Sequence, residues 1–110
     1  MKITTIKSNR DFQRIYHRGR SFVSPALVTY ALKTKNHNLR IGITTSKKVG
    51  KAVNRNRSRR VIRAAFYHLN ADNSASYDII FVARTRTAFV KSYEVERYMR
   101  EHFKKLGIID

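Results

Sequence analysis

Residues 46–63, SKKVGKAVNRNRSRRVIR, constrain this chain more than any other segment. They hold eight lysines and arginines and no acid, and Arg40 adds a ninth cation just upstream. On a helix, like charges three or four residues apart destabilise by roughly 0.2–0.5 kcal/mol per pair, and Arg55 with Arg59 and Arg59 with Arg63 are such pairs. Charge gathered in this way does not stabilise a fold. It predicts a polyanionic partner that neutralises the segment.

The charge of the whole chain supports the same interpretation. It carries 24 lysines and arginines against 7 acids, a formal net charge of +17, and residues 1–71 contain a single acid, Asp11. Such a field attracts nucleic acid. A membrane surface is the competing polyanion, but no apolar run approaches the ~20 residues of a membrane span, and no segment has the layout of a signal peptide. We therefore expect a nucleic-acid partner and no membrane.

Length and composition favour one small domain over residues 1–110. The hydrophobic content of 42% is sufficient for a core, which excludes a disordered basic tail. The chain has no cysteine, which excludes a disulfide framework and a thiolate metal site and is typical of a reducing cytoplasm.

The pattern at the N-terminus predicts a helix over residues 8–18. Ser8 is placed to cap it, Asp11 to complete a capping box, and Gly19 to end it. Strands are predicted over residues 21–33, 39–45 and 77–84, the second antiparallel to the first. Alternation puts Phe22, Val28 and Tyr30 on one face of the first strand.

Two longer helices are predicted over residues 53–69 and 92–105. Ser92 is placed to cap the second one, and Gly107 to end it. Each has an apolar stripe at helical spacing. The stripes consist of Ser58, Val61, Ile62, Ala65, Phe66 and Leu69 in the first helix, and of Val95, Met99, His102, Phe103 and Leu106 in the second. The expected order is αββαβα, an α+β domain with a small sheet packed against helices.

Catalytic groups are scarce. No pair of carboxylates is placed to hold Mg²⁺, so we expect no catalytic and no metal-binding residue on this chain. A ribonuclease pairing built from His17 or His68 stays open. The aromatic residues near the basic run could stack bases or simply belong to the core.

Residues 42–66, GITTSKKVGKAVNRNRSRRVIRAAF, resemble the signature of the bacterial ribonuclease P protein subunit. In that family a strand ends in Ser-Lys-Lys, a glycine-containing loop follows, and a helix opens with Arg-Asn-Arg. Ser58 departs mildly from the family, which more often has an aliphatic residue there. The resemblance extends over residues 6–106.

The resemblance implies a protein that partners a catalytic RNA and, without an obligate protein partner, assists removal of the 5′ leader from precursor tRNA. It implies that Mg²⁺ is held mainly by the RNA subunit. It also implies a ribosomal-protein-like two-layer sandwich with a left-handed βαβ crossover. Residues expected to bind the catalytic RNA are Lys47, Lys48, Lys51, Arg55, Asn56, Arg57, Arg59, Arg60 and Arg63. Residues expected to line a cleft for the leader are Phe12, Tyr16, Phe22, Val28 and Tyr30.

Two other functions account for the charge and the size. One is a ribosomal or other structural RNA-binding protein, which needs neither the aromatic cleft nor the Arg55-Asn56-Arg57 entry to the helix. The other is a ribonuclease that acts without an RNA subunit. Cleavage of precursor tRNA with and without the catalytic RNA separates all three.

Overall fold

The computed structural model describes residues 4–71 and 74–109. Within them the strands are β1 (Thr4–Thr5), β2 (Arg20–Val23), β3 (Leu27–Lys33), β4 (Leu39–Thr44) and β5 (Tyr77–Ala83). The α-helices are α1 (Asn9–Arg18), α2 (Ala52–Leu69) and α3 (Ser92–Leu106), and the short 3₁₀ turns η1 (Lys47–Val49) and η2 (Thr85–Phe89) precede α2 and α3. This is an α+β fold whose helices and later strands follow the predicted order.

The strands form one mixed sheet in the order β1-β4-β5-β3-β2. The central strand β5 runs parallel to β4 and antiparallel to β3. Strand 39–45 is therefore antiparallel to β3, as predicted, but β5 separates the two. Helix α2 joins the parallel neighbours β4 and β5 in a βαβ crossover, whose left hand remains a prediction.

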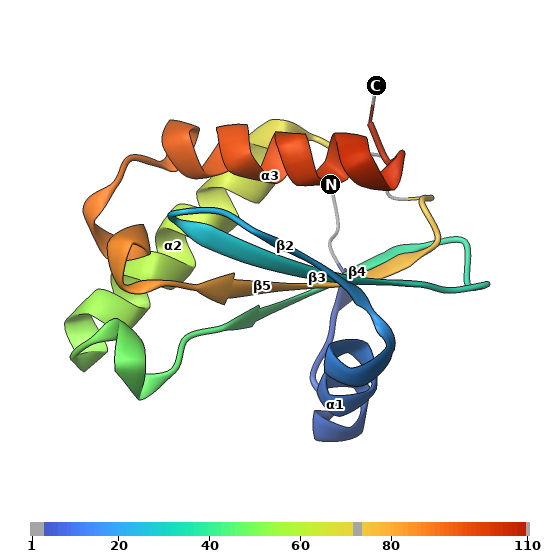
Figure 1. The fold of residues 1–110 in the computed structure, drawn as a ribbon, viewed down its shortest axis with the longest axis horizontal. Coiled ribbons are helices and arrows are strands. Elements are labelled where there is room, and N and C mark those ends of the chain that lie inside the picture. The colour runs from blue at the N-terminus through green and yellow to red at the C-terminus, as the bar shows by residue number, and fades with distance from the viewer. Residues whose placement is uncertain (1–3, 72–73, 110) are drawn as a thin grey trace.

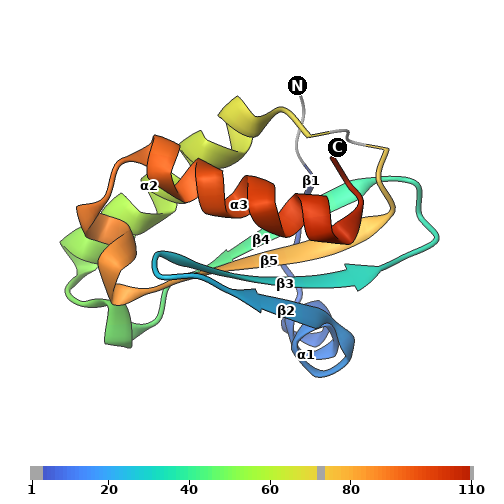
Figure 2. The ribbon, with the colours of Figure 1, turned by 45° about the horizontal axis from the view of Figure 1, so that its top comes forward.

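Helices cover both faces of the sheet (Figures 1 and 2). Helices α2 and α3 lie together on one face, and α1 lies alone on the other. Alternation along β5 serves both layers: Ile79 and Phe81 join the large core under α2 and α3, whereas Ile80 joins a smaller cluster with Ile6 and Ile15 of the α1 layer. The expected packing of a sheet against helices is confirmed, with α1 added on the opposite face.

The apolar stripes of the two long helices are confirmed. In α2 the buried residues are Ser58, Ile62, Ala65, Phe66 and Leu69, and in α3 they are Val95, Met99, His102, Phe103 and Leu106. Gly107 ends α3 with a φ of 77°, a conformation that favours glycine. The predicted cap at Ser92 is wrong, because Ser92 is the first residue of the helix and no side chain caps α3.

The predicted single strand over residues 21–33 is wrong, because the chain turns back on itself around Pro25. Strand β2 pairs antiparallel with β3, and Phe22 lies opposite Thr29. Cross-strand partners share a face, so Phe22 lies on the face of Thr29 and not on that of Tyr30. Its ring stacks on His102 of α3 with centroids 5.6 Å apart.

Candidate nucleic-acid interface

Two surfaces of different chemistry stand out. We call the first the basic face; it comprises the exposed side chains of η1 and of the outer side of α2. Helix α2 has no acid in its first turn. Within residues 4–71 and 74–109, none of the ion pairs involves a cation of this face. The exposed residues of the basic face are Lys47, Lys48, Lys51, Asn56, Arg57, Arg59, Arg60 and Arg63.

Arg55, predicted with this set, has a different position. It is half-buried, and its Nη1 donates a hydrogen bond to the carbonyl oxygen of Gly50 at 3.0 Å. Gly50 has a φ of 132°, which side chains rarely adopt. Arg55 therefore holds the loop that leads from η1 into α2, whereas the exposed arginines that follow it leave their guanidinium groups available.

Ser58, the departure from the family pattern, is fully buried against the core side of α2. Its hydroxyl donates to the carbonyl oxygen of Asn54 at 2.9 Å, one turn earlier. This bond satisfies the polar group inside the core. The substitution of an aliphatic residue by serine is thus compatible with the packing of α2.

We call the second surface the aromatic face; it consists of Phe12, Tyr16, Val28, Tyr30 and Val82, where α1 lies on the sheet. The rings of Tyr16 and Tyr30 meet edge to face with centroids 4.9 Å apart, and Phe12 lies 6.3 Å from Tyr16. All five residues are half-buried, so part of each side chain reaches solvent. The structure therefore brings four of the five predicted cleft residues to one face, Val28 by the alternation of β3.

Phe22 is the exception among the predicted cleft residues. It packs against the large core beside α3, on the other side of the sheet. Its assignment to the cleft is wrong because the hairpin at Pro25 places it across from Thr29.

Two glycines allow α1 to approach the sheet. A Cβ on Gly42 would stand 2.8 Å from Cζ of Phe12, and one on Gly19 would stand 2.9 Å from the carbonyl oxygen of Ala31. Neither distance is tolerated between such atoms. The position of the Phe12 ring, and thus the shape of the aromatic face, depends on the missing side chain of Gly42.

A cluster of charged residues also holds α1 against the sheet. Asp78 of β5 is fully buried and accepts hydrogen bonds from Arg40 of β4 and Arg14 of α1. Asp11 lies 3.3 Å from Arg14 and 3.5 Å from Arg40. The hydrogen bond with Asp78 is the main reason that the pKa of Arg40 is raised. The predicted capping role of Asp11 is wrong, since no side chain caps α1 and Asp11 instead joins this cluster.

Sequence reasoning missed Val82 of the aromatic face and two residues beside that face, Thr44 and Arg84. The hydroxyls of Tyr16 and Thr44 lie 2.8 Å apart, which links α1 to the end of β4. A depression of about 250 Å³ then runs between β5 and η1, and its lining includes Val82, Lys48 and Arg84. Alternation along β4 and β5 shows which face Thr44 and Val82 share with their neighbours in each strand. The order of the strands is needed to place them beside α1.

The acids within residues 4–71 and 74–109 do not form a magnesium site. Asp11 and Asp78 are paired with arginines, and no group of three metal-ligating side chains occurs in the described residues. Burial alone would raise the pKa of Glu96, but hydrogen bonds from Arg100 and His68 lower it. His68, a candidate for a ribonuclease pairing, has its Nδ1 2.6 Å from Oε1 of Glu96.

Membrane insertion finds no support among the helices of residues 4–71 and 74–109. None combines the length and the apolar character that crossing a bilayer requires.

Known proteins match the chain over nearly its whole length. The family model described as Ribonuclease P matches residues 1–107. The ribonuclease P protein component of Clostridioides difficile is 40% identical over 105 residues, covering 94% of this chain and 91% of the relative. That of Listeria monocytogenes is 40% identical over 103 residues, covering 93% and 86%.

Solved structures agree with the sequence matches. The RNase P protein of Staphylococcus aureus has a TM-score of 0.80 at 33% identity, covering 99% of this chain and 100% of the other. The protein from Thermotoga maritima has a TM-score of 0.77 at 24% identity, covering 92% and 96%, and shows a shared fold. On the family match and these relatives together, the chain belongs to the ribonuclease P protein family.

Proposed function

We propose that this chain acts as the protein subunit of ribonuclease P, an endoribonuclease built on a catalytic RNA that removes the 5′ leader of precursor tRNA. In this role the basic face binds the catalytic RNA and the aromatic face binds the leader. The observation that carries the proposal is that α2, which bears most of the basic face, and α1, which bears part of the aromatic face, lie on opposite faces of the sheet (Figure 1). One surface offers cations to phosphates and the other offers ring faces to bases.

The chemistry of each surface suits its proposed ligand. Exposed lysines and arginines neutralise phosphates and release counterions, which gives affinity with little dependence on sequence. Half-buried aromatic rings stack the bases of a single strand for roughly 1–3 kcal/mol each. The leader is single-stranded, whereas mature tRNA lacks it, so the aromatic face provides a basis for preferring the precursor.

Mg²⁺ enters this proposal as a cofactor held mainly by the RNA subunit. The carboxylates of Asp11 and Asp78 are engaged with arginines, and their chemistry on this chain is structural. The chain's own contribution is to bind and orient two RNA partners, the catalytic RNA and precursor tRNA. No further protein partner is needed, and a cytoplasmic location follows from those partners.

A cleavage assay tests the proposal. Precursor tRNA and Mg²⁺ are incubated with the protein alone, with the catalytic RNA alone, and with both. Faster leader removal only when both are present is the expected result. Cleavage by the protein alone would support a self-sufficient ribonuclease instead, and RNA binding without any effect on cleavage would support a structural RNA-binding protein.

A further inference from the structure

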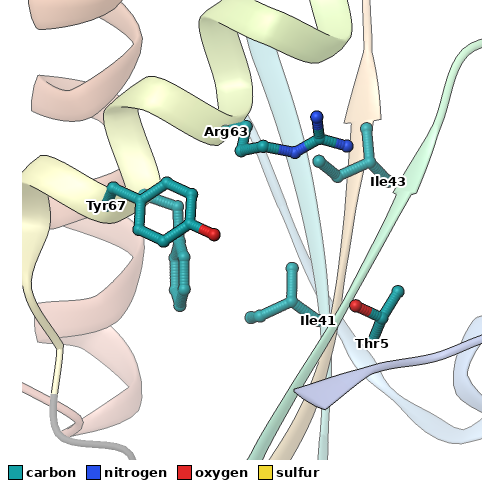
Figure 3. A pocket seen from close by; sticks show the side chains of 6 residues that line it. Thr5, Ile41, Ile43, Arg63 and Tyr67 are labelled. Atoms are coloured by element: carbon teal, nitrogen blue, oxygen red, sulfur yellow. The ribbon is translucent and has the colours of Figure 1, made fainter. Parts of the chain in front are cut away.

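A small cavity lies between α2 and the β1–β4 edge of the sheet (Figure 3). It measures about 150 Å³ and is lined by Thr5, Ile41, Ile43, Arg63, Phe66 and Tyr67. Along β4, Ile41 and Ile43 point to this side, whereas Gly42 and Thr44 point to the side of α1. The cavity is therefore distinct from the surface proposed to bind the leader.

The floor and the rim of the cavity differ in chemistry. Ile41 and Phe66 are buried and supply apolar walls. Figure 3 shows the Arg63 side chain extending from α2 toward Ile43, and the Tyr67 hydroxyl pointing toward the sheet. The cavity thus combines an apolar interior with a cation and hydroxyl groups at its opening, where Thr5 supplies the second hydroxyl.

Size and charge select the occupant. An apolar cavity of about this volume holds a single benzene ring in another protein, so one six-membered ring fits here, whereas a fused pair would extend beyond the cavity. Arg63 belongs to a helix without acids over its first turns, and none of the described ion pairs involves it. A ring joined to an anion satisfies both the interior and the rim.

We propose that this cavity binds an unstacked pyrimidine base of the RNA that lies on the basic face, with Arg63 contacting the phosphate of the same nucleotide. Proteins that read RNA by sequence do so mainly at unpaired bases that can leave the stack. Tyr67 and Thr5 are placed to meet the polar edge of the base. The inference rests on the proposed binding of RNA by the basic face. It adds to that face, which otherwise contacts phosphates, a site that recognises a base.

Isoleucine methyl NMR tests the site directly on the whole protein. The probes are uridine 3′-monophosphate, adenosine 3′-monophosphate and ribose 5-phosphate, which has the anion but no ring. A base in the cavity should shift the methyl signals of Ile41 and Ile43 through its ring current, while Ile15 and Ile80 in the α1 layer serve as internal controls. We expect shifts with uridine 3′-monophosphate and none with ribose 5-phosphate.

Three results would overturn the proposal. Equal shifts with ribose phosphate would indicate an anion site without a base. Equal affinity for the adenine nucleotide would remove the argument from size. Shifts confined to Ile80 would place the base on the aromatic face.

Variants connect the cavity to binding of the catalytic RNA. Ile43→Phe fills the cavity and Ile43→Val leaves it open, so only the first should abolish the shift of Ile41. Tyr67→Ala removes an exposed wall, and it should weaken the shift even if Ile43→Phe proves too unstable to study. In binding to the catalytic RNA, Ile43→Phe should lose roughly tenfold in affinity relative to Ile43→Val, because the filled cavity no longer admits the base.

The cleavage assay keeps the two proposals apart. Normal stimulation of cleavage together with no response of Ile41 to uridine 3′-monophosphate would reject the base site alone. A response of Ile41 without any stimulation would reject the proposed function and leave a nucleotide-binding site. Equal affinities of Ile43→Phe and Ile43→Val for the catalytic RNA would reject a base in the cavity.

Discussion

Arg40 donates two hydrogen bonds to the fully buried carboxylate of Asp78, from Nε to Oδ1 at 2.8 Å and from Nη2 to Oδ2 at 2.6 Å. Arg14 of α1 donates a third at 3.0 Å. One side chain of β5 thus joins the neighbouring strand β4 and helix α1. Such paired, charge-assisted contacts fix geometry as well as contributing energy.

Replacing Asp78 by Asn should destabilise the protein, because two guanidinium groups then lack their counter-charge. Removal of one partner from a buried pair costs about 3–5 kcal/mol, and the partial exposure of both arginines places this case toward the lower end. Urea unfolding measures the change. Asp11→Asn is the control, since its contacts are longer and more exposed, and a loss as large as that of Asp78→Asn would contradict the central position given to Asp78.

Alanine at Arg59, Arg60 or Arg63 should weaken binding to the catalytic RNA without weakening the fold. Each lost phosphate contact should lower the slope of log affinity against log salt by something under about one unit. The melting temperature should be unchanged or slightly higher, because the repulsion between like charges along α2 is reduced. Marked destabilisation in all three variants would show that these side chains hold the fold instead.

Arg55→Ala should behave differently from those three variants. Its guanidinium donates to the carbonyl of Gly50, so its removal should cost about 0.5–1.5 kcal/mol of stability in addition to any loss of RNA affinity. A thermal melt of Arg55→Ala beside Arg59→Ala measures the difference. Identical melting temperatures would indicate that the contact with Gly50 contributes nothing to stability.

Tyr30→Ala should reduce affinity for precursor tRNA by roughly 1–3 kcal/mol and hardly affect mature tRNA. The residue is half-buried, so stability should fall as well, and binding must be measured where the variant is folded. Phe22→Ala is the matched control, a half-buried ring on the opposite face that should cost stability without changing the preference. Equal loss for both tRNAs in Tyr30→Ala would reject the leader assignment.

His102 should make the fold sensitive to mild acid. Burial, followed by the nearby charge of Lys105, lowers its pKa, and its Nδ1 lies 2.7 Å from the hydroxyl of Thr29. A depressed pKa means that the unfolded chain takes up the proton first, so its contribution is full above about pH 6.5 and declines as the pH falls toward the folded pKa.

Urea unfolding at about pH 7.5 and about pH 5.5 measures this dependence. Each unit of pKa difference corresponds to about 1.4 kcal/mol. His102→Gln removes the titrating group and should lose less stability than the wild type over that interval. The exposed histidines are common to both proteins and cancel in the comparison. A steeper loss in His102→Gln would reverse the assigned sign.

The helices were predictable because their signals are local. The stripe from Ser58 to Leu69 repeats at 3.6 residues, and Gly107 can end α3 without help from other elements. The prediction of one strand over residues 21–33 was wrong because the alternation continues through Pro25 and does not reveal that the chain reverses direction there. The position of β5 between β3 and β4 depends on pairing between distant segments, which periodicity does not encode.

The site was predictable in part for the same reason. The exposed arginines of α2 follow from one helix, but the place of Phe22 requires the hairpin register and the role of Asp11 requires Arg40, which is distant in the sequence. The cavity under Arg63 needs three elements at once, β1, β4 and α2. Strand β1 has only two residues, which is too short for an alternating pattern that would predict it.

The central position of β5 also determines when the sheet can assemble during synthesis of the chain. Strands β3 and β4 both hydrogen-bond to β5 and not to each other, although they precede it in the chain. Until Tyr77–Ala83 has been synthesised, each of them has an open edge, and Asp78 is not yet available to Arg40 and Arg14. A chain cut before Tyr77 therefore contains every arginine of the basic face but only two separate strand pairs, β1 with β4 and β2 with β3, so the ability to attract RNA precedes the ability to orient it.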